Sequence, residues 1–408
     1  NDYVNVGVIT GVNKGTIYNS FVNGKINVVS DTDRVNIGGL TGRTQSNVYV
    51  EEYDDIDTES NSYVVGSITG EDSTSTFANN GYNSEISIVF KGTEKLDSLF
   101  ENTSALPNTN IGGIAGVVTT YATHKNNNAN ESYVGYGATL DNGKQLPGVS
   151  IYQYNMESIK TIYNLSVAPN IVSVDKDNNL LPANVGGVVG YSHSTLIDKV
   201  EVLPVSLQTY SNVGGIIGYA YASSIQQSVV EFANLGQTGI DTVSITAKQN
   251  IGGMVGYGVD VNIAYSYVRA YFNGKAIDDT YYGNLLLLES EETEKNIGGL
   301  IGKLDSYGIS NQIKTAGESA GFNIEAYVKT VSTTSASAII NSYFNADINT
   351  DYQTLSGTVN IGGLIGKTTN MDIKVDVVDS SDEKVNSLLI TDSYFYGNIS
   401  QAKGQEYT

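Results

Sequence analysis

The chain has 408 residues, of which 40% are hydrophobic, so it can bury a sizeable core and is not disordered by composition. Its 43 acidic side chains against 22 basic ones give a net charge of −21, which repels nucleic acid and anionic membranes. The absence of cysteine excludes a disulfide-stapled scaffold, a thiolate metal site and a cysteine nucleophile.

One motif, Asn-Ile-Gly-Gly-Leu-Ile-Gly, recurs along the whole chain and is called the glycine motif. The copies that keep all three glycines lie at 36–42, 110–116, 184–190, 212–218, 250–256, 296–302 and 360–366. Two copies are degenerate: Asn5–Gly11 has Val8 in the fourth place, and Val64–Gly70 has Ser67 there. A repeat that runs from end to end favours one elongated unit over several separate domains. The longest interval, between the copies at 110–116 and 184–190, leaves room for a further worn copy near 132–137.

The glycine motif predicts a strand, a corner and the start of a second strand. Its second place is always β-branched and its fifth is always apolar. Residues three apart in a flat strand face opposite sides, so both can reach one core only if the glycines bend the backbone. Since the fourth place accepts Val8 and Ser67, the corner is predicted to need only the first and last glycines.

Two other places of the motif carry predictions. The sixth place changes from Thr10 to Ile365 along the chain, which indicates a half-exposed side chain. The first place is asparagine in all copies but the one at 64–70, which predicts an amide ladder between stacked repeats.

A looser phrase of aromatic and β-branched residues follows several copies. It reads Asn-Ser-Phe-Val at 19–22, Ser-Tyr-Val at 266–268, Asn-Ser-Tyr-Phe at 341–344 and Asp-Ser-Tyr-Phe at 392–395. These are strand-forming residues, so each repeat is expected to hold two or three short strands. One such unit cannot bury its own apolar face, but a stack of units can.

The motif and its following phrase resemble the GLUG-motif repeats of large bacterial cell-surface proteins, with Gly-Gly-Leu-Ile-Gly and Asn-Ser-Tyr-Phe in the family's order. Such repeats occur in adhesin-like proteins and in non-catalytic portions of IgA-cleaving zinc metallopeptidases. The resemblance implies an all-β fold, a right-handed parallel β-helix (β-solenoid), on the exterior of a bacterium. Because the sequence starts at Asn1 without a signal peptide, we expect any targeting signal to lie outside it.

Polar and acidic segments, such as 51–57, 126–128 and 289–294, separate the copies. We expect a single solenoid over 1–408 with irregular loop insertions near 43–60, 71–108, 119–182, 275–294 and 367–388. Only 94–102, with apolar residues at helical spacing, predicts a short helix.

No segment carries a complete catalytic signature. Gly366-Lys367-Thr368 resembles the end of a phosphate-binding P-loop, but Ile361 stands where the opening glycine should be. Gly190-Tyr191-Ser192-His193-Ser194 lacks the closing glycine of a nucleophile elbow. The two histidines, His124 and His193, lie far apart in sequence and give no local zinc signature, and His-Glu-x-x-His is missing. We therefore assign no catalytic, cofactor-binding or metal-ligating residue.

Calcium is the metal that the acidity favours most. The segments 175–179 and 347–351 place oxygen ligands at alternate positions, but both lack the glycine and the glutamate of a calcium loop. Tyrosine, at 29 residues, could stack on sugars or pack along the sheet, and packing is the interpretation we favour.

These observations predict a non-catalytic extracellular module, a surface adhesin or stalk that presents a binding surface. Its partner would be a host or neighbouring-cell protein or glycan, or further copies of itself. Two alternatives stay open: a carbohydrate-active enzyme on a β-helix, either a lyase or a hydrolase, and a structural subunit of a surface filament or layer. Convergent carboxylates in a groove would favour the enzyme, whereas a mass that rises with concentration would favour the subunit.

Overall fold

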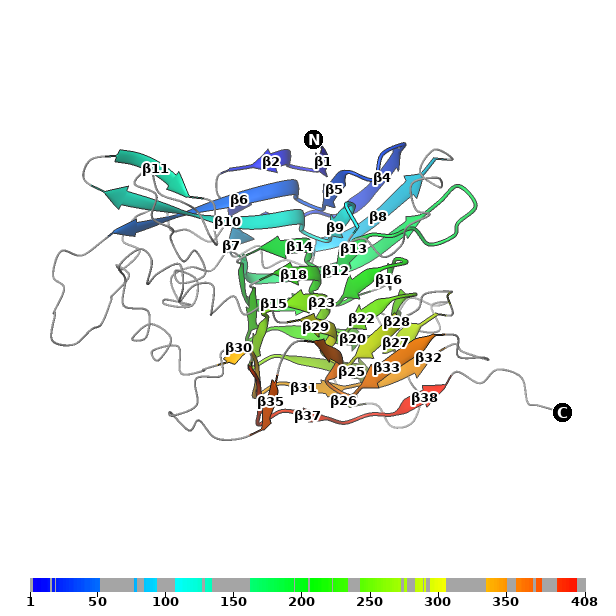
Figure 1. Ribbon diagram of the computed structural model, residues 1–408. Coiled ribbons are helices and arrows are strands. Elements are labelled where there is room, and N and C mark those ends of the chain that lie inside the picture. Colours follow the sequence, from blue (N-terminus) through cyan, green and yellow to red (C-terminus); the bar gives the residue numbers. More distant parts are fainter. Residues whose placement is uncertain are drawn as a thin grey trace, which may run out of the picture.

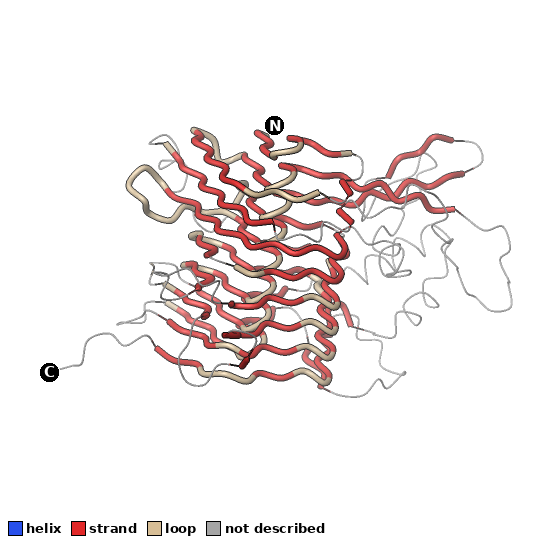
Figure 2. The backbone as a smooth tube through the Cα atoms, turned by 180° about the vertical axis from the view of Figure 1, so that it is seen from behind, coloured by secondary structure: helices blue, strands red, loops and turns tan. Residues whose placement is uncertain are grey.

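The computed structural model is all-β and consists of parallel strands stacked repeat upon repeat (Figure 1). The structure describes residues 3–14, 17–18, 20–51, 77–78, 84–93, 107–126, 129–133, 162–193, 195–204, 206–221, 223–233, 243–272, 275–276, 283–288, 290, 294–305, 335–350, 357–369, 372–375 and 387–401. The repeats lie one above the other from the N-terminal to the C-terminal end, so each sheet takes its strands from successive repeats (Figure 2).

Two sheets are built from the glycine motif. Sheet A is formed by β1 (Val4–Gly7), β5 (Val35–Gly38), β9 (Asn110–Gly112), β13 (Asn184–Gly186), β17 (Asn212–Gly214), β22 (Asn250–Gly252), β28 (Glu294–Gly298) and β33 (Thr358–Gly362). Sheet B continues each of them after the corner, as β2 (Thr10–Asn13), β6 (Thr41–Glu51), β10 (Ala115–Asn126), β14 (Val189–His193), β18 (Ile217–Tyr221), β23 (Val255–Val259), β29 (Ile301–Asp305) and β34 (Ile365–Thr369). A rung is one sheet A strand together with the chain that leads to the next sheet A strand, and the rungs are numbered one to eight.

The rest of each rung forms a third set of strands, paired in parallel between rungs. In rungs one to four these are β3 (Ile17–Tyr18), β4 (Gly24–Ser30), β7 (Phe77–Ala78), β8 (Ser84–Gly92), β12 (Ile162–Val174), β15 (Leu196–Val202) and β16 (Ser206–Gln208). In rungs five and six they are β19 (Ser224–Gln226), β20 (Val229–Ala233), β21 (Val243–Ala247), β24 (Asn262–Ala264), β25 (Tyr267–Phe272) and β27 (Gly283–Leu287). In rungs seven and eight they are β30 (Ser335–Ile340), β31 (Tyr343–Asn345), β32 (Asp347–Thr350), β36 (Ser387–Thr391), β37 (Tyr394–Phe395) and β38 (Ile399–Gln401).

Three short strands lie beside this stack. β11 (Ala129–Tyr133) pairs antiparallel with β10, and β26 (Lys275–Ala276) pairs antiparallel with β25. β35 (Asp372–Val375) pairs in parallel with β36.

The register corrects the number of repeats in the stack. The copy at 64–70 lies outside the described residues, and β5 pairs directly with β9, so no rung lies between the copies at 36–42 and 110–116. The further copy expected near 132–137 is also wrong as a rung, because β9 pairs directly with β13. Its first residues instead end β11, which forms a hairpin with β10. The described residues therefore form eight stacked rungs rather than nine or more.

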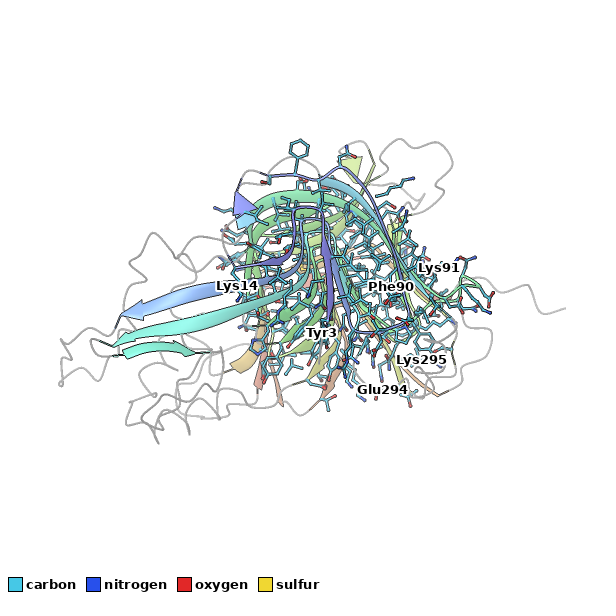
Figure 3. All side chains as sticks on the ribbon, turned by 90° about the horizontal axis from the view of Figure 1, so that it is seen from above. Tyr3, Lys14, Phe90, Lys91, Glu294 and Lys295 are labelled. Carbon is cyan, nitrogen blue, oxygen red and sulfur yellow. The ribbon has the colours of Figure 1, made fainter. Side chains whose placement is uncertain are left out.

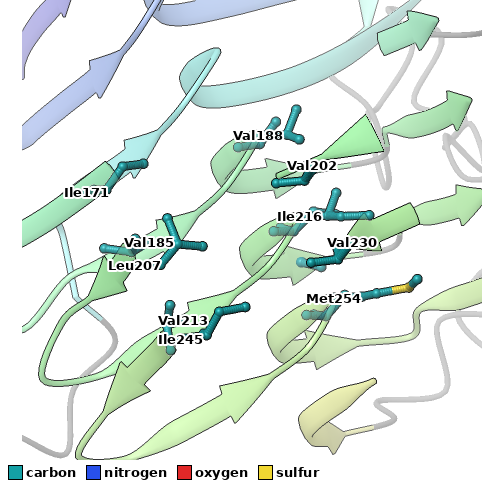
Figure 4. Packing of buried hydrophobic residues seen from close by; sticks show 14 of the residues in the cluster. Ile171, Val185, Val188, Val202, Leu207, Val213, Ile216, Val230, Ile245 and Met254 are labelled. Carbon is teal, nitrogen blue, oxygen red and sulfur yellow. The ribbon is translucent and has the colours of Figure 1, made fainter. Parts of the chain in front are cut away.

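The core confirms the apolar places of the motif and corrects one of them. In the interior rungs the second and fifth places are buried, as shown by Val185, Val188, Val213, Ile216 and Met254, all with 0% exposure (Figure 4). The sixth place is not half-exposed as expected. It is fully buried from rung two to rung seven, because the corner turns it toward the interior; the residues are Thr41, Ala115, Val189, Ile217, Val255 and Ile301. Side chains of the third set, among them Phe90, fill the remaining space between the sheets (Figure 3).

All three glycines of an interior corner are required, which corrects the expectation that two suffice. A β-carbon at the third place, Gly252, would lie 2.0 Å from the carbonyl oxygen of Val255 in its own corner. At the fourth place, Gly253, it would lie 2.2 Å from the carbonyl oxygen of Gly299 in the next rung. At the seventh place, Gly256, it would lie 2.6 Å from the amide nitrogen of Val213 in the preceding rung.

The predicted asparagine ladder is confirmed and runs through all eight rungs. From rung two on, the side-chain amide of the first-place asparagine donates to the side-chain oxygen of the asparagine one rung earlier, at 2.7–2.9 Å; the residues are Asn5, which only accepts, and Asn36, Asn110, Asn184, Asn212, Asn250, Asn296 and Asn360. The bonds all point the same way, so the ladder has a polarity along the stack.

The second phrase forms a sharp bend in the third set of strands. The residue before its serine has a positive φ in successive rungs, as at Gln227 (48°), Asn341 (45°) and Asp392 (49°). The serine hydroxyls then link neighbouring rungs. The hydroxyl of Ser266 accepts a hydrogen bond from the amide of Ser228 in the preceding rung, at 3.1 Å, and donates to the carbonyl of Ala264, two residues earlier. Asparagine and aspartate tolerate this backbone conformation, which explains their recurrence before the serine.

Several of the segments predicted as insertions also contain strands of the stack. β8 lies within 71–108, β12 within 119–182 and β27 within 275–294. The helix expected at 94–102 lies outside the described residues.

Candidate interaction surface

The outer face of sheet B carries a group of rings in its middle rungs. The residue directly after the glycine motif is tyrosine in rungs four, five and six, and the register places Tyr191, Tyr219 and Tyr257 in one column. Two residues further along each strand, His193 of rung four is in register with Tyr221 of rung five. Because successive side chains of a strand point to opposite faces of the sheet, these side chains point away from the core. We call these five residues the aromatic strip.

The rings of the strip lie face to face between rungs. The ring centroids of Tyr191 and Tyr219 are 5.3 Å apart with planes 14° from parallel, and those of His193 and Tyr221 are 5.0 Å apart at 10°. Tyr219 and Tyr257 are 5.1 Å apart but tilted by 50°. Parallel strands lie about 4.8 Å apart, so identical positions bring rings into stacking distance automatically.

A second tyrosine column shows the same packing on the third set of strands. Tyr267, Tyr343 and Tyr394 have successive centroid distances of 4.9 Å, with planes within 7° of parallel. Ring faces that cover one another are not available to a flat sugar ring, and only ring edges and hydroxyls are left to face outward. This geometry favours packing over sugar stacking for both columns.

Charged groups border the strip toward the C-terminal rungs. The ammonium of Lys303 lies 5.0 Å from the ring centroid of Tyr257, and the Tyr257 hydroxyl donates to the carboxylate of Asp305 at 2.6 Å. Glu294 forms ion pairs with Lys303, at 3.7 Å, and with Lys367. Burial opposes the charged form of Glu294, but hydrogen bonds from Lys367 and Asn296 and the nearby lysine charges outweigh it, so its pKa is lowered.

The histidine of the strip is held neutral. Burial lowers the pKa of His193 to about 4, although a hydrogen bond with its own backbone acts in the opposite direction. Its sequence neighbour Ser192 points to the other side of the strand, where its fully buried hydroxyl lies 2.8 Å from that of Ser223. Ser192 and His193 therefore form no nucleophile and base pair, and His124 lies in β10, in register with Val50 and Glu131.

The other candidate segments are occupied by structural bonds. The carboxylate of Asp175 accepts the amides of Asp177 and Asn179, both at 2.8 Å, and the side chain of Asn179 at 2.7 Å. Burial raises its pKa, but these bonds outweigh that effect and lower it. In the other segment the carboxylate of Asp347 accepts the amide of Asn398 at 2.9 Å, and burial raises its pKa. Neither carboxylate is directed at a common centre with other acidic groups.

Lys367 of the P-loop-like segment lies within the strand β34, where it pairs with Glu294. Among the described residues there is no group of three or more histidine, aspartate or glutamate side chains placed to hold a metal ion. The same part of the chain has no helix with the length and hydrophobicity needed to cross a membrane.

Four long connections of the chain join a sheet B strand to the third set, at the same corner of the repeat, and a fifth, 93–109, joins the third set to sheet A in rung two. In rungs four to six this corner spans 194–195, 222–223 and 260–261. In rungs two, three, seven and eight it spans 52–76, 127–161, 306–334 and 370–386, in two cases with a short strand, β11 or β35. The aromatic strip thus lies in the rungs with short corners, between two pairs of rungs with long ones.

Sequence reasoning did not single out this strip. The signal was present as a tyrosine directly after Gly190, Gly218 and Gly256, in three successive copies. Searches of protein-family models, curated proteins and solved structures found nothing that matches this chain.

Proposed function

We propose that this chain is a non-catalytic module of a bacterial surface protein, a right-handed β-solenoid of the GLUG-repeat kind that presents a binding surface. The observation that carries the proposal is the common corner at which four long connections follow the sheet B strands, in rungs two, three, seven and eight. A stack that keeps its register while four connections lengthen at one corner supports a display role, since loops on one face form a continuous surface.

The aromatic strip and its charged border complete this surface. Tyrosine, histidine and lysine edges, with Glu294 beside them, suit contacts with a protein or with the polar groups of a glycan. The candidate catalytic groups do not converge: Ser192 faces away from His193, and Asp175 and Asp347 are engaged in their own turns. An extracellular adhesive or stalk role is the function that these features support best.

The experiment removes one long connection while keeping the register. Rung six serves as the template for a shortened rung seven. Asp305 is in register with Val259, and the hydroxyl of Ser337 accepts a hydrogen bond from the amide of Val261, so the ends of the rung seven connection lie beside the ends of the short rung six corner. Joining Asp305 to Ser337 through one residue, as Asp260 joins Val259 to Val261, should leave the stack intact. The equivalent change in rung eight joins Thr369 to Leu388.

Purified wild-type chain is tested against arrays of host and bacterial glycans and extracellular proteins. We expect a specific ligand whose binding falls at least tenfold when one of the long connections is removed, with an unchanged unfolding temperature. Val29→Lys, at a 70% exposed position away from the corner, is the matched control and should bind normally. Binding that survives removal of every long connection, or a lyase or hydrolase activity of the purified chain, would refute the proposal.

A further inference from the structure

Two strands of sheet B continue well beyond the corner at which the others end. The other strands of sheet B have four or five residues, whereas β6 has 11 and β10 has 12. The two long strands stay paired in parallel as far as Glu51 and Lys125. Together with the hairpin strand β11 they form a three-stranded sheet that projects from the side of the stack (Figure 1). We call it the projecting sheet.

The two edges of the projecting sheet differ in what covers them. On one side of β10, β14 pairs only as far as Thr119, and β11 then covers the same side from Ala122 to Asn126, running antiparallel. On the outer side of β6, β2 pairs only as far as Thr44. From Gln45 to Glu51, no strand of the described residues pairs with this side of β6. We call the segment 45–51 the β6 edge.

The β6 edge has the features of a strand that accepts another strand. Its sequence, Gln-Ser-Asn-Val-Tyr-Val-Glu, contains no proline and no lysine, the residues with which proteins commonly keep an exposed edge from pairing. Val48, Tyr49 and Val50 favour the β conformation. The backbone amides and carbonyls along such an edge are a template for hydrogen bonds with a further strand. β11 shows that this sheet takes an antiparallel strand at its other edge.

The strand that fits this edge best is the β6 edge of a second copy. Glu51 is the only charged residue of the edge, although the chain carries 43 acidic and 22 basic side chains. When two edges run antiparallel with Val48 opposite Val48, Glu51 is opposite Gln45 of the other copy. A parallel pairing in register would instead bring the two Glu51 residues together, and like charges directly opposite each other destabilise a pair of strands. The antiparallel register avoids this repulsion and gives every residue of both edges a partner.

We propose that two copies pair their β6 edges antiparallel about a two-fold axis at Val48, so that the two projecting sheets become one continuous sheet. Both copies use the same surface, so the contact closes as a dimer and adds no third copy. The pairing takes place beside the stack and needs neither the first nor the last rung to be uncovered. It is separate from the aromatic strip, which lies in rungs four to six, whereas β6 belongs to rung two.

The size and the charge of the contact set its strength. A standard interface has roughly 20–30 residues on each side, and the β6 edge is much shorter, so we expect dimers only at high micromolar to millimolar concentration. Each copy carries a net charge of −21, so two copies repel each other at low ionic strength. The screening length falls from about 10 Å at 0.1 M salt to about 3 Å at 1 M. Association should therefore strengthen as salt is added.

Because the chain has no cysteine, single introduced cysteines can test the register. Directly opposite residues of antiparallel strands have Cα atoms about 4.5 or 5.5 Å apart, which a disulfide can span. Val48→Cys should therefore give a disulfide-linked dimer under mild oxidation at 1 M salt. Gln45→Cys and Glu51→Cys should each stay monomeric alone and cross-link when mixed. Sedimentation of the wild-type chain up to millimolar concentration should show monomers and dimers and no larger species.

Val29→Cys, at a 70% exposed strand position on the stack, is the matched control and should cross-link at least tenfold more slowly than Val48→Cys. Val48→Lys places like charges opposite each other at the two-fold axis and should abolish the dimer, and an equal mixture with Val48→Glu should restore it. A wild-type chain that stays monomeric at 1 M salt overturns the proposal, as does Val48→Cys that cross-links no faster than Val29→Cys, since another strand then covers the edge. Gln45→Cys that cross-links alone as fast as Val48→Cys overturns the two-fold register.

Discussion

At the scale of single residues, the fourth place of the glycine motif shows how a rung depends on its neighbour. Val8 occupies this place in rung one, and its amide donates to the carbonyl of Gly39, at 3.3 Å. In rung two the amide of Gly39 instead donates to the carbonyl of Gly112, a third-place glycine, also at 3.3 Å. The fourth-place amide of rung one thus bonds to the fourth-place glycine of the next rung, whereas that of rung two bonds to the third-place glycine. The Val8 side chain is accommodated in this displaced corner.

Replacing an interior fourth-place glycine should be costly. In Gly253→Ala the new β-carbon would lie 2.2 Å from the carbonyl oxygen of Gly299 and 2.8 Å from a methyl carbon of the buried Val268, so the corner has no room for it. Overpacking of this kind typically costs about 1–3 kcal/mol, and we expect the upper part of that range. Urea denaturation measures the free energy of unfolding. Val29→Ala, at a 70% exposed strand position, is the control and should change it by less than about 0.5 kcal/mol. Equal effects of the two substitutions would contradict the corner assignment.

At the scale of the element, the asparagine column links strands that are distant in sequence. Asn212 donates to Asn184 at 2.8 Å and accepts from Asn250 at 2.7 Å, and it is 1% exposed. Asn5 stands at the end of the same column and takes part in one ladder bond, accepting from Asn36 at 2.9 Å. The cost of losing an asparagine should therefore depend on its rung.

Asn212→Ala should destabilise the chain by about 1–3 kcal/mol, because it leaves buried amide groups of Asn184 and Asn250 without their partners. Asn5→Ala should cost less than about 1 kcal/mol, because it removes one ladder bond and one bond to the Tyr3 carbonyl at a position that water reaches. Thermal and urea denaturation of both variants check this. A larger effect for Asn5→Ala would show that the ladder does not stabilise the interior.

The element scale also shows what sequence alone could predict. The second, fifth and first places of the motif predicted the core columns and the amide ladder because neighbouring rungs repeat the same residue at the same depth. The sixth place was predicted wrongly, since the direction of a side chain after a corner depends on how sharply the corner turns. The aromatic strip was missed because its tyrosines matter only as a column, and the intervals between copies do not show which copies are adjacent.

At the scale of the whole molecule, adjacency is set by which copies join the stack. The copy at 64–70 fits the motif almost as well as 5–11, yet β5 pairs directly with β9. A motif thus predicts that a segment can form a rung, while the register is decided by the strands on either side. Long connections are tolerated because extra length adds little to the entropy of closing a loop. This explains how rungs with very different spacing in sequence lie in uniform register.

The pH dependence of stability tests the strip as part of the whole stack. The pKa of His193 is lowered to about 4 by burial, whereas the unfolded chain has the ordinary value near 6.5. As the pH falls below about 6.5 the unfolded state takes up a proton that the folded state refuses until about pH 4, so the free energy of unfolding falls across this window. The contribution of His193 to the slope should stay below about 1.4 kcal/mol per pH unit, because unfolding takes up at most one proton at this ring.

His193→Tyr extends the stack on Tyr221 with a ring that does not titrate in this window, so it should flatten the decline between pH 6.5 and 4. Glu294 and Asp175, whose pKa values are lowered, should still cost stability as the pH falls through their own titrations. Asp347, whose pKa is raised, acts in the opposite sense. Urea denaturation at half-unit steps from pH 7.5 to 4.5 measures both chains. An unchanged slope in His193→Tyr would show that the imidazole is not held neutral by its place in the strip.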